Sequence, residues 1–273
     1  MPELPEVETL KRALTPLVLN KRLLKLRFLR KDLRFSIPLS KLREGLLNQT
    51  VSKITRKGKY ILMHVPDGAL LIHLGMSGRV IQTSSMKPMK KHTHAVFKFE
   101  PDVYLHYVDP RRFGCLLWVP KGQTHPLLEG LGPDPLGEEI AATEMKLVAK
   151  KCSKASIKSF LMNAKRISGV GNIYACEVLF AARVSPKKPA RKINSVQWGL
   201  ILSTLRDILQ KSIVAGGTTL RDFYNTDGSQ GYYKLSLTVY DREDKPCPVC
   251  TEPIKRIVQS ARSTFYCKVC QKY

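Results

Sequence analysis

Hydrophobic spacing divides the chain into a β-rich first half and a helical second half. Apolar residues recur every three or four positions over residues 5–18, with basic residues off that stripe, which predicts a leading amphipathic helix. Short apolar runs punctuated by Gly and Pro follow, which predict strands. These runs lie at about 24–28, 60–65, 69–74, 95–99, 103–108 and 115–119. Their close spacing predicts a sandwich or barrel instead of alternating β and α units.

A cluster of helix and strand breakers at residues 131–137, Leu-Gly-Pro-Asp-Pro-Leu-Gly, predicts a domain boundary. Helical patterns follow it, at 138–151, 156–163, 172–183 and 194–215. Residues 216–234 are rich in Gly, polar and aromatic residues and predict a loop, either a surface connector or a lid over a ligand. We therefore expect three domains, at 1–133, 134–235 and 236–273.

The charge balance indicates a polyanionic partner. The chain has 46 Lys and Arg against 22 Asp and Glu, a net charge of +24, and such an excess favours phosphate backbones. Charge alone does not separate DNA from RNA, or an enzyme from a binding protein.

The length and composition of the chain predict a folded protein. At 273 residues and 43% hydrophobic it has enough apolar residues to form hydrophobic cores. It shows neither a signal peptide pattern nor a bilayer-spanning stretch, so we expect a cytoplasmic, nucleoid-associated protein without membrane contact.

Four of the seven cysteines form two C-x2-C pairs near the end of the chain. The four are Cys247, Cys250, Cys267 and Cys270. This spacing predicts one tetrahedral zinc ion, and four cysteine ligands leave no open position, so the zinc is expected to be structural. Two disulfides are the alternative, but no secretion signal supports them. The other cysteines are interpreted as reduced packing residues.

The start of the chain offers a candidate nucleophile. Removal of Met1 would give Pro2 a free secondary amine, which can attack a sugar carbon and form an iminium. An α-amino group has a pKa of about 7.7–8.0 and is therefore partly neutral near neutral pH. The alternative is structural, because Pro begins helices and acidic residues such as Glu3 and Glu6 complement the helix dipole. Taken alone, these residues favour the structural interpretation.

Seven motifs in a fixed order change that balance. They are Pro-Glu-Leu-Pro-Glu-Val-Glu at 2–8, Lys-Gly-Lys-Tyr at 57–60, His-Leu-Gly-Met-Ser-Gly at 73–78, Asp-Pro-Arg-Arg-Phe-Gly at 109–114, Gly-Val-Gly-Asn-Ile-Tyr-Ala at 169–175, Gly-Gly-Thr-Thr-Leu at 216–220, and the four-cysteine ribbon. Together they resemble the bacterial formamidopyrimidine-DNA glycosylase family, which excises oxidised purines such as 8-oxoguanine. Each motif alone is weak, but seven in family order are specific.

The resemblance implies an α+β multidomain fold. Its parts are an N-terminal β-sandwich with a leading helix, a helix–two-turn–helix domain, and a C-terminal zinc finger built on a β-hairpin. The implied partner is damaged double-stranded DNA in a cleft between the two halves. The resemblance also implies one structural Zn²⁺ and a monomer.

The resemblance further implies a bifunctional glycosylase and lyase mechanism. Pro2 would attack C1′ of the damaged nucleotide, Glu3 would act as the acid, and Glu6 would contact the lesion or its water. Lys59 and Arg262 match the residues that assist β- and δ-elimination, where a positive charge stabilises the departing phosphate.

A base inside a duplex is unreachable, so such an enzyme must flip the nucleotide out and fill the gap. By resemblance, Met76, Arg111 and Phe113 are the wedge residues; core packing is the alternative for the two apolar ones. Residues that match backbone contacts are His73, His92, Arg112, Lys154 and Asn172. Lys158 and residues 218–233 are candidates for contacting the everted base.

The sequence departs from the family pattern near the finger. Asp241 and Asp244 stand where relatives generally carry Gly, and Ala261 stands where Gln or Gly is commoner. These departures concern the local geometry of the finger hairpin and leave the chemistry intact.

Three other interpretations remain open. A sister glycosylase for oxidised pyrimidines, endonuclease VIII, shares the Pro-Glu start, but the intact 109–114 motif and Met76 favour the purine enzyme. A non-catalytic zinc-ribbon DNA-binding protein would not need Pro2, Glu3 or Lys59. An RNA-binding ribbon protein would account for the charge but not for Pro2.

Overall fold

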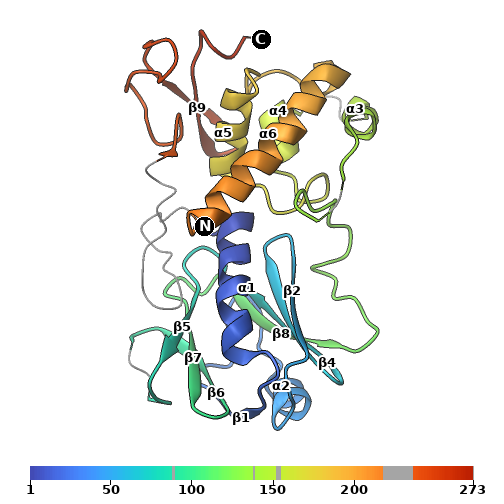
Figure 1. The fold of residues 1–273 in the computed structure, drawn as a ribbon, viewed down its shortest axis with the longest axis vertical. Coiled ribbons are helices and arrows are strands. Elements are labelled where there is room, and N and C mark those ends of the chain that lie inside the picture. The colour runs from blue at the N-terminus through green and yellow to red at the C-terminus, as the bar shows by residue number, and fades with distance from the viewer. Residues whose placement is uncertain (88–89, 138, 152–154, 218–235, 273) are drawn as a thin grey trace. The chain divides into compact units, whose positions relative to one another are not determined.

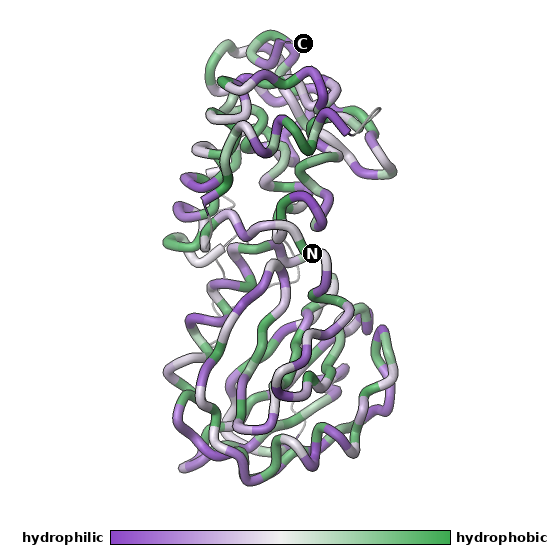
Figure 2. Tube along the Cα trace, turned by 90° about the vertical axis from the view of Figure 1, so that its right-hand side faces the viewer, coloured by the Kyte–Doolittle hydropathy of each residue, from purple (hydrophilic) through white to green (hydrophobic). Residues whose placement is uncertain are grey.

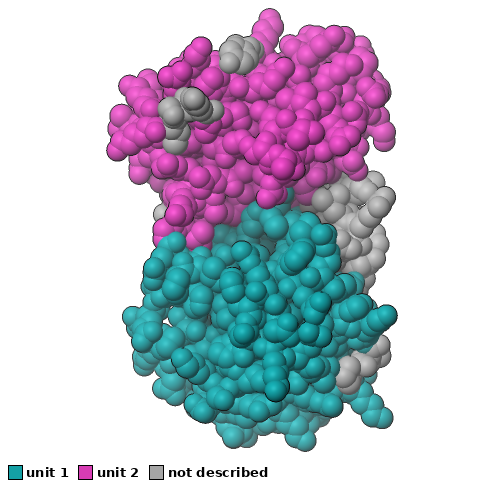
Figure 3. All heavy atoms as spheres, turned by 180° about the vertical axis from the view of Figure 1, so that it is seen from behind, with its two compact units in different colours: residues 1–129, 215–234 teal, residues 130–214, 235–273 magenta. Residues whose placement is uncertain are grey.

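The structure, a computed structural model, describes residues 1–87, 90–137, 139–151, 155–217 and 236–272 (Figure 1). Most of the predicted loop at 216–234, and with it Lys154 and Cys152, lies outside the described residues. The chain divides into two compact units, residues 1–129 with 215–234 and residues 130–214 with 235–273 (Figure 3). Each unit is described by itself below.

Two four-stranded antiparallel sheets form most of the first unit, in the strand orders β1-β6-β7-β5 and β2-β3-β4-β8. The first sheet comprises β1 (Leu23–Phe28), β5 (Arg79–Thr83), β6 (Thr93–Phe99) and β7 (Val103–Val108). The second comprises β2 (Lys53–Lys57), β3 (Tyr60–Val65), β4 (Gly68–His73) and β8 (Cys115–Pro120). Buried residues of both sheets share one hydrophobic core, which confirms the predicted sandwich. Hydrophobic and hydrophilic residues interchange over short distances along this part of the chain (Figure 2).

The leading helix, α1 (Leu4–Val18), packs against that core and contacts β2 and β3. Its buried apolar residues recur at helical spacing, and Leu10 and Leu14 are at most 2% exposed. Truncating such a side chain to Ala costs about 2–5 kcal/mol. A second helix, α2 (Leu39–Leu46), contacts β4 and β8. The core therefore fixes α1, and with it the start of the chain, against the second sheet.

Helices dominate the second unit, as predicted, with ends that differ by a few residues from the expected ones. They are α3 (Ala142–Lys150), α4 (Ile157–Leu161), α5 (Asn172–Ala181), the 3-10 helix η1 (Ala190–Lys192) and α6 (Ser195–Val214). Both α3 and α5 pack against α6. Most of α5 is buried because it is predominantly apolar and has no distinct polar face.

The finger hairpin consists of β9 (Lys255–Gln259) and β10 (Arg262–Tyr266) and packs against α5. Glu177 of α5, only 3% exposed, accepts hydrogen bonds from three consecutive backbone N–H groups of residues 238–240, at 2.8–3.0 Å. Phe180 of α5 and Phe265 of β10 share an apolar cluster with the cysteines. The finger is thus part of one compact unit with the helices.

Among the described helices, none combines the length and the apolar character that crossing a bilayer would require.

Candidate functional site

The start of α1 brings the predicted nucleophile together with two carboxylates. Pro2 is buried and directly precedes the N-cap residue Glu3. Glu3 and Glu6 are 3% and 2% exposed, and the Glu3 backbone N–H donates to Glu6 Oε2 at 2.8 Å. Gly217, at a φ of +84°, lies so close that an added Cβ would be 3.2 Å from Glu6 Oε1. A carboxylate in this position also stabilises the helix start electrostatically.

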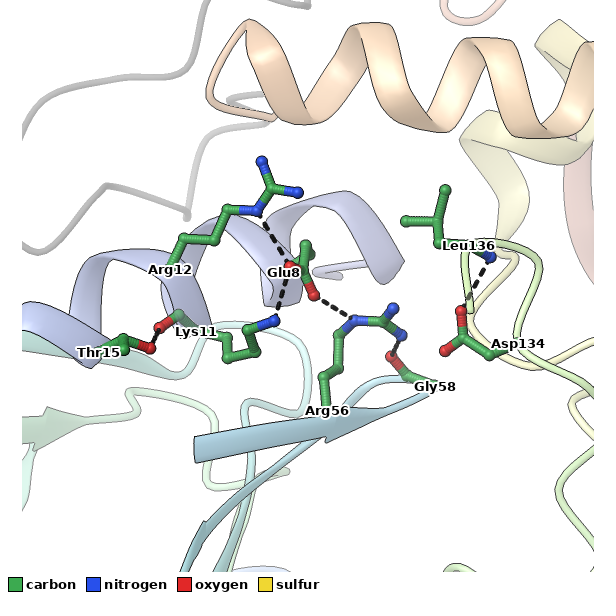
Figure 4. A network of polar contacts seen from close by, with 8 residues as sticks. All are labelled: Glu8, Lys11, Arg12, Thr15, Arg56, Gly58, Asp134 and Leu136. Atoms are coloured by element: carbon green, nitrogen blue, oxygen red, sulfur yellow. Dashed lines mark hydrogen bonds and ion pairs between the residues drawn. The ribbon is translucent and has the colours of Figure 1, made fainter. Parts of the chain in front are cut away.

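One turn further along α1, Glu8 links the helix to β2 (Figure 4). It accepts hydrogen bonds from Lys11 Nζ at 2.8 Å, Arg12 Nε at 3.0 Å and Arg56 Nε at 2.8 Å. Burial favours a higher pKa for Glu8, but these three cationic donors outweigh it and lower the pKa below its usual value of 4.5. Arg56 Nη1 also donates to the carbonyl oxygen of Gly58 at 3.0 Å.

That carbonyl belongs to the turn that carries Lys59. Gly58 and Lys59 connect β2 to β3, and Gly58 adopts a φ of +57°, which favours glycine. Arg56 therefore contacts the residue directly before Lys59. The first turns of α1 and the Lys59 turn are joined through one buried network.

His73, at the end of β4, lies near Lys59 and is held neutral. Burial is the largest cause that lowers the pKa of His73, followed by the charges of Lys59 and Arg34, and together they bring it to about 4. The Gly75 backbone N–H donates to His73 Nδ1 at 3.1 Å. A neutral imidazole whose Nδ1 accepts carries its proton on Nε2. His73 therefore offers a neutral N–H donor at neutral pH, beside the cation of Lys59.

A buried carboxylate, Asp109, organises the two loops that carry the predicted wedge residues. It is 0% exposed, and its Oδ1 accepts from Ser77 Oγ at 2.7 Å while its Oδ2 accepts from the Gly114 N–H at 2.8 Å. Ser77 Oγ accepts in turn from the Arg111 N–H at 3.1 Å. These bonds join residues 74–78 to residues 109–114. The sequence shows Asp109 as part of the 109–114 motif, but does not predict this role for it.

The two loops present the wedge candidates next to one another. Phe113 is 46% exposed, and the Arg111 guanidinium carbon lies 5.2 Å from its ring centroid. Met76 is half-buried. Gly75 contacts the backbone of Phe113 so closely that a Cβ would collide with it, at a φ of +60°. Phe113 is thus on an exposed loop and outside the core.

Two further residues predicted to contact the DNA backbone lie on or beside these loops. Arg112 is exposed and adopts a φ of +57° directly before Phe113. His92 is exposed, with a φ of +71°, and its carbonyl accepts from the Asp109 N–H at 3.1 Å. Their exposure is compatible with contact to a backbone phosphate, and their DNA-binding role stays a prediction.

In the second unit, Lys158 and Asn172 both contact the hairpin beside Arg262. Asn172, the first residue of α5, donates from Nδ2 to the Ser263 carbonyl at 2.9 Å. Lys158 is 1% exposed and donates to the same carbonyl at 3.1 Å and to Thr264 Oγ1 at 2.7 Å. A buried ammonium with these partners differs from the accessible group that the everted-base prediction assumes, and that prediction is untested. Arg262 itself is exposed at the start of β10.

The four cysteines of the ribbon form a site of metal-binding size. Their sulfur atoms all lie within 4.8 Å of one another, and two of the distances are 3.4 Å, for Cys250 and Cys267, and 3.8 Å, for Cys247 and Cys270. A disulfide would require about 2.05 Å. Four thiolates at Zn–S distances of about 2.3 Å in a tetrahedron lie about 3.8 Å apart, so this donor set fits Zn²⁺ and leaves no open position.

Comparison with known proteins matches three segments of the chain to family models. They are the formamidopyrimidine-DNA glycosylase N-terminal domain over residues 1–116, the formamidopyrimidine-DNA glycosylase H2TH domain over 131–224, and the zinc finger found in FPG and IleRS over 244–272.

Full-length relatives carry the same name. The formamidopyrimidine-DNA glycosylase of Methylococcus capsulatus is 42% identical over 273 residues, with 100% of both chains covered. That of Legionella pneumophila is 40% identical, covering 99% of this chain and 98% of its own.

Solved structures match over the same length. The MutM (FPG) protein of Thermus thermophilus has a TM-score of 0.88 at 37% identity, covering 99% of this chain and 98% of its own. A Lactococcus lactis FPG mutant in complex with a DNA that contains Fapy-dG has a TM-score of 0.91 at 31% identity, with both chains covered completely.

The fold, the four-cysteine site and the matched domains define a zinc-finger DNA glycosylase of the H2TH class. Within that class, the similarity to relatives named formamidopyrimidine-DNA glycosylase extends over the whole chain. The chain belongs to the formamidopyrimidine-DNA glycosylase family.

Proposed function

We propose that this chain is a bifunctional DNA glycosylase and AP lyase that removes oxidised purines, 8-oxoguanine and formamidopyrimidines, from double-stranded DNA. One observation supports the proposal: Pro2 is buried and directly precedes Glu3, whose backbone N–H donates to the buried carboxylate of Glu6 at the start of a helix anchored in the core. Structural relatives that were solved with damaged DNA support the substrate class.

The first step is nucleophilic displacement at the sugar. Once Met1 is removed, the lone pair of the Pro2 nitrogen forms a bond to C1′, and the glycosidic bond breaks toward the base. Glu3 supplies a proton to a departing or ring oxygen. Sugar-ring opening then leaves an iminium between Pro2 and C1′. With Met1 attached, the Pro2 nitrogen is an amide whose lone pair is delocalised into the Met1 carbonyl, so it cannot act as the nucleophile.

The iminium makes the neighbouring sugar C–H acidic, so strand cleavage follows. A proton leaves C2′, its electron pair forms a double bond, and the 3′ phosphate departs with the C–O electron pair; a second elimination releases the 5′ phosphate. Lys59 and Arg262 stabilise the negative charge that develops on each leaving phosphate. The Glu8–Arg56 network orients the Lys59 turn for this role.

Recognition uses residues of the first unit, most of them on exposed loops, together with Asn172 of the second unit. Flipping a nucleotide out costs a few kcal/mol of stacking. Met76 and Phe113 fill the vacated space and Arg111 hydrogen-bonds the orphaned partner base, while His73, His92, Arg112 and Asn172 contact the phosphate backbone. The stacking of Arg111 on Phe113 keeps these two side chains together before DNA binds.

Zinc contributes folding free energy to the hairpin that carries Arg262. Cys247, Cys250, Cys267 and Cys270 would hold the ion. We further infer that the enzyme acts as a monomer in the bacterial cytoplasm, associated with the nucleoid.

Borohydride trapping on duplex DNA with a single 8-oxoguanine tests the proposal. Reduction of the iminium to a stable amine should give a covalent complex, and mass spectrometry of its peptides should place the adduct on Pro2 in protein that has lost Met1. A Pro2→Gly variant should keep a primary amine and partial activity. A protein shown to retain Met1 should bind DNA without trapping.

Three outcomes would contradict the proposal. Full trapping by protein that retains Met1 would remove Pro2 as the nucleophile. Faster excision of thymine glycol than of 8-oxoguanine would favour an endonuclease VIII activity, and DNA binding without any trapping would favour a non-catalytic zinc-ribbon protein.

A further inference from the structure

Helix α4 contacts the finger hairpin on both sides of Arg262. Ser159 Oγ lies 3.2 Å from the Oγ of Ser260, two residues before Arg262. The preceding residue of the same helix, Lys158, donates from Nζ to the carbonyl of Ser263, directly after Arg262, at 3.1 Å. Two consecutive residues of one helix therefore contact the hairpin before and after Arg262, and the contact from Lys158 is made to its backbone.

The contact of Lys158 with the hairpin is buried and consists of two hydrogen bonds. Lys158 is 1% exposed and Thr264, which accepts from Nζ at 2.7 Å, is 0% exposed. The Ser263 carbonyl also accepts from Asn172 Nδ2 at 2.9 Å, so both of its lone pairs are used. Burying an ammonium costs free energy, and hydrogen bonds to its acceptors offset that cost. The buried Lys158 therefore favours the position of β10 in which these acceptors are within its reach.

Arg262 is exposed, in contrast to the buried Lys158 and Thr264. It follows directly after two residues of positive φ, Ser260 at +49° and Ala261 at +57°, and it is exposed while Thr264 is buried. A long, exposed guanidinium is useful in a reaction only if its backbone is fixed. A misplacement of about 1 Å at a reacting centre can cost about 100-fold in rate.

We propose that Lys158 is a positioning residue for Arg262: without touching DNA, it holds β10 so that the guanidinium meets the phosphate that leaves during elimination. The inference rests on the proposed lyase function. In that step a proton leaves the sugar, a carbon–carbon double bond forms, and the phosphate departs with the electron pair of its C–O bond. Lys158 neither donates nor accepts a proton.

The test uses the zinc-loaded full-length protein and the variant Lys158→Met, which keeps an unbranched side chain one atom shorter and removes the ammonium donors. Cleavage of a duplex with a preformed abasic site is measured in single turnover at saturating enzyme, beside borohydride trapping of the same substrate. We expect cleavage to fall about 10- to 100-fold while trapping changes less than about twofold. The matched control is Lys192→Met, which removes an exposed lysine of η1 and should change neither.

Two further variants separate positioning from direct contact. In an Arg262→Ala background, Lys158→Met should cause no additional loss of cleavage, because the group that it positions is absent. Thr264→Val removes one acceptor of Lys158 and keeps the size of the side chain, so it should reproduce part of the loss with trapping intact. If Lys158→Met fails to retain zinc, Thr264→Val alone decides the question.

The proposal is overturned if Lys158→Met lowers trapping as much as cleavage, if its effect adds fully to that of Arg262→Ala, or if Thr264→Val leaves cleavage unchanged. Any of these would assign Lys158 to the substrate or to general stability. Failure of the wild-type protein to trap at all would instead contradict the proposed function, so the two failures are distinguishable.

Discussion

Arg56 of β2 and Glu8 of α1 form a buried ion pair, with 2.8 Å between Nε and Oε2 and side chains that are 7% and 8% exposed. Arg56 also donates a hydrogen bond from Nη1 to the carbonyl oxygen of Gly58. The pair therefore connects the helix that begins beside Pro2 with the turn that presents Lys59. Forty-eight residues separate the two partners in sequence.

Breaking this pair from one side should destabilise the first unit strongly. Glu8→Gln leaves the Arg56 guanidinium buried without its carboxylate, and loss of one partner of a buried pair costs about 3–5 kcal/mol. Urea unfolding at pH 7 measures the difference. The matched control is Glu100→Gln, whose pair with Arg22 is exposed and should contribute about 0–1 kcal/mol. Equal losses for the two variants would contradict a special role for Glu8.

The same pair predicts a pH dependence of stability. Because the folded pKa of Glu8 is lowered below 4.5, the native state stabilises the carboxylate. That stabilisation is complete above the unfolded pKa and is lost as the pH falls through the lower folded pKa. The difference in free energy of unfolding between wild type and Glu8→Gln should be constant at neutral pH and shrink below about pH 4.5. A difference that grows on acidification would exclude this assignment.

His73 should stay uncharged throughout the physiological range. Its ring should titrate near pH 4, against an ordinary value of 6.5, when followed by NMR of the folded protein. In Lys59→Met the pKa should rise, because one nearby positive charge is removed, yet remain below 6.5, because burial is the larger cause. Since the folded state resists protonation, this residue lowers stability as the pH falls from about 6.5 toward 4. A pKa for His73 at or above 6.5 in the wild-type protein would refute the neutral-donor assignment.

Ala261→Gly should stabilise the finger hairpin. Ser260 and Ala261 form the two-residue connection between β9 and β10 and both have positive φ, a conformation that costs an L-residue about 1–2 kcal/mol. After the greater backbone entropy of Gly is subtracted, we expect a gain of about 0.5–1 kcal/mol. Asp241→Gly is the comparison, at a φ of +59°, and should gain less because Asp tolerates this region. Thermal unfolding with zinc bound measures both, and a loss for Ala261→Gly would show that its methyl group packs usefully.

The wedge residues should separate recognition from chemistry. Met76→Ala and Phe113→Ala should slow excision of 8-oxoguanine from a duplex more than they slow cleavage at a preformed abasic site, which has no base to unstack. Lys59→Ala should impair both reactions, since its charge acts on the phosphate. Single-turnover rates at fixed salt give the comparison, because phosphate contacts make affinity depend on salt. Equal losses on both substrates for Met76→Ala would return Met76 to a packing role.

Loss of zinc should unfold the finger and lower catalysis with it. Cys267→Ser removes one ligand, and because metal binding and folding are linked in such small sites, the hairpin should unfold and Arg262 should lose its place. DNA binding and strand cleavage should then fall together, with zinc content measured on the same preparation. Retained cleavage in a protein shown to lack zinc would argue against the coupling.

Local patterns were enough to predict the parts whose determinants are close together in the chain. The stripe of Leu10 and Leu14 predicted α1, and the two C-x2-C pairs predicted the zinc ligands, because helical periodicity and ligand spacing are properties of a few consecutive residues. Family motifs added the identity of Pro2 and Lys59 as candidates. They did not reveal how either residue is supported.

The tertiary structure decided the contacts that join distant segments. The sequence does not predict that Glu8 pairs with Arg56 or that Asp109 hydrogen-bonds to residues of two loops. Nor does it predict that Lys158 contacts a strand residue 105 positions away. A lysine on a short helix is exposed by default, and only the packing of α4 and α5 against β10 buries this one. Sequence determines which donors and acceptors exist, but their partners follow from which surfaces the folded chain removes from water, where each buried polar group must be satisfied.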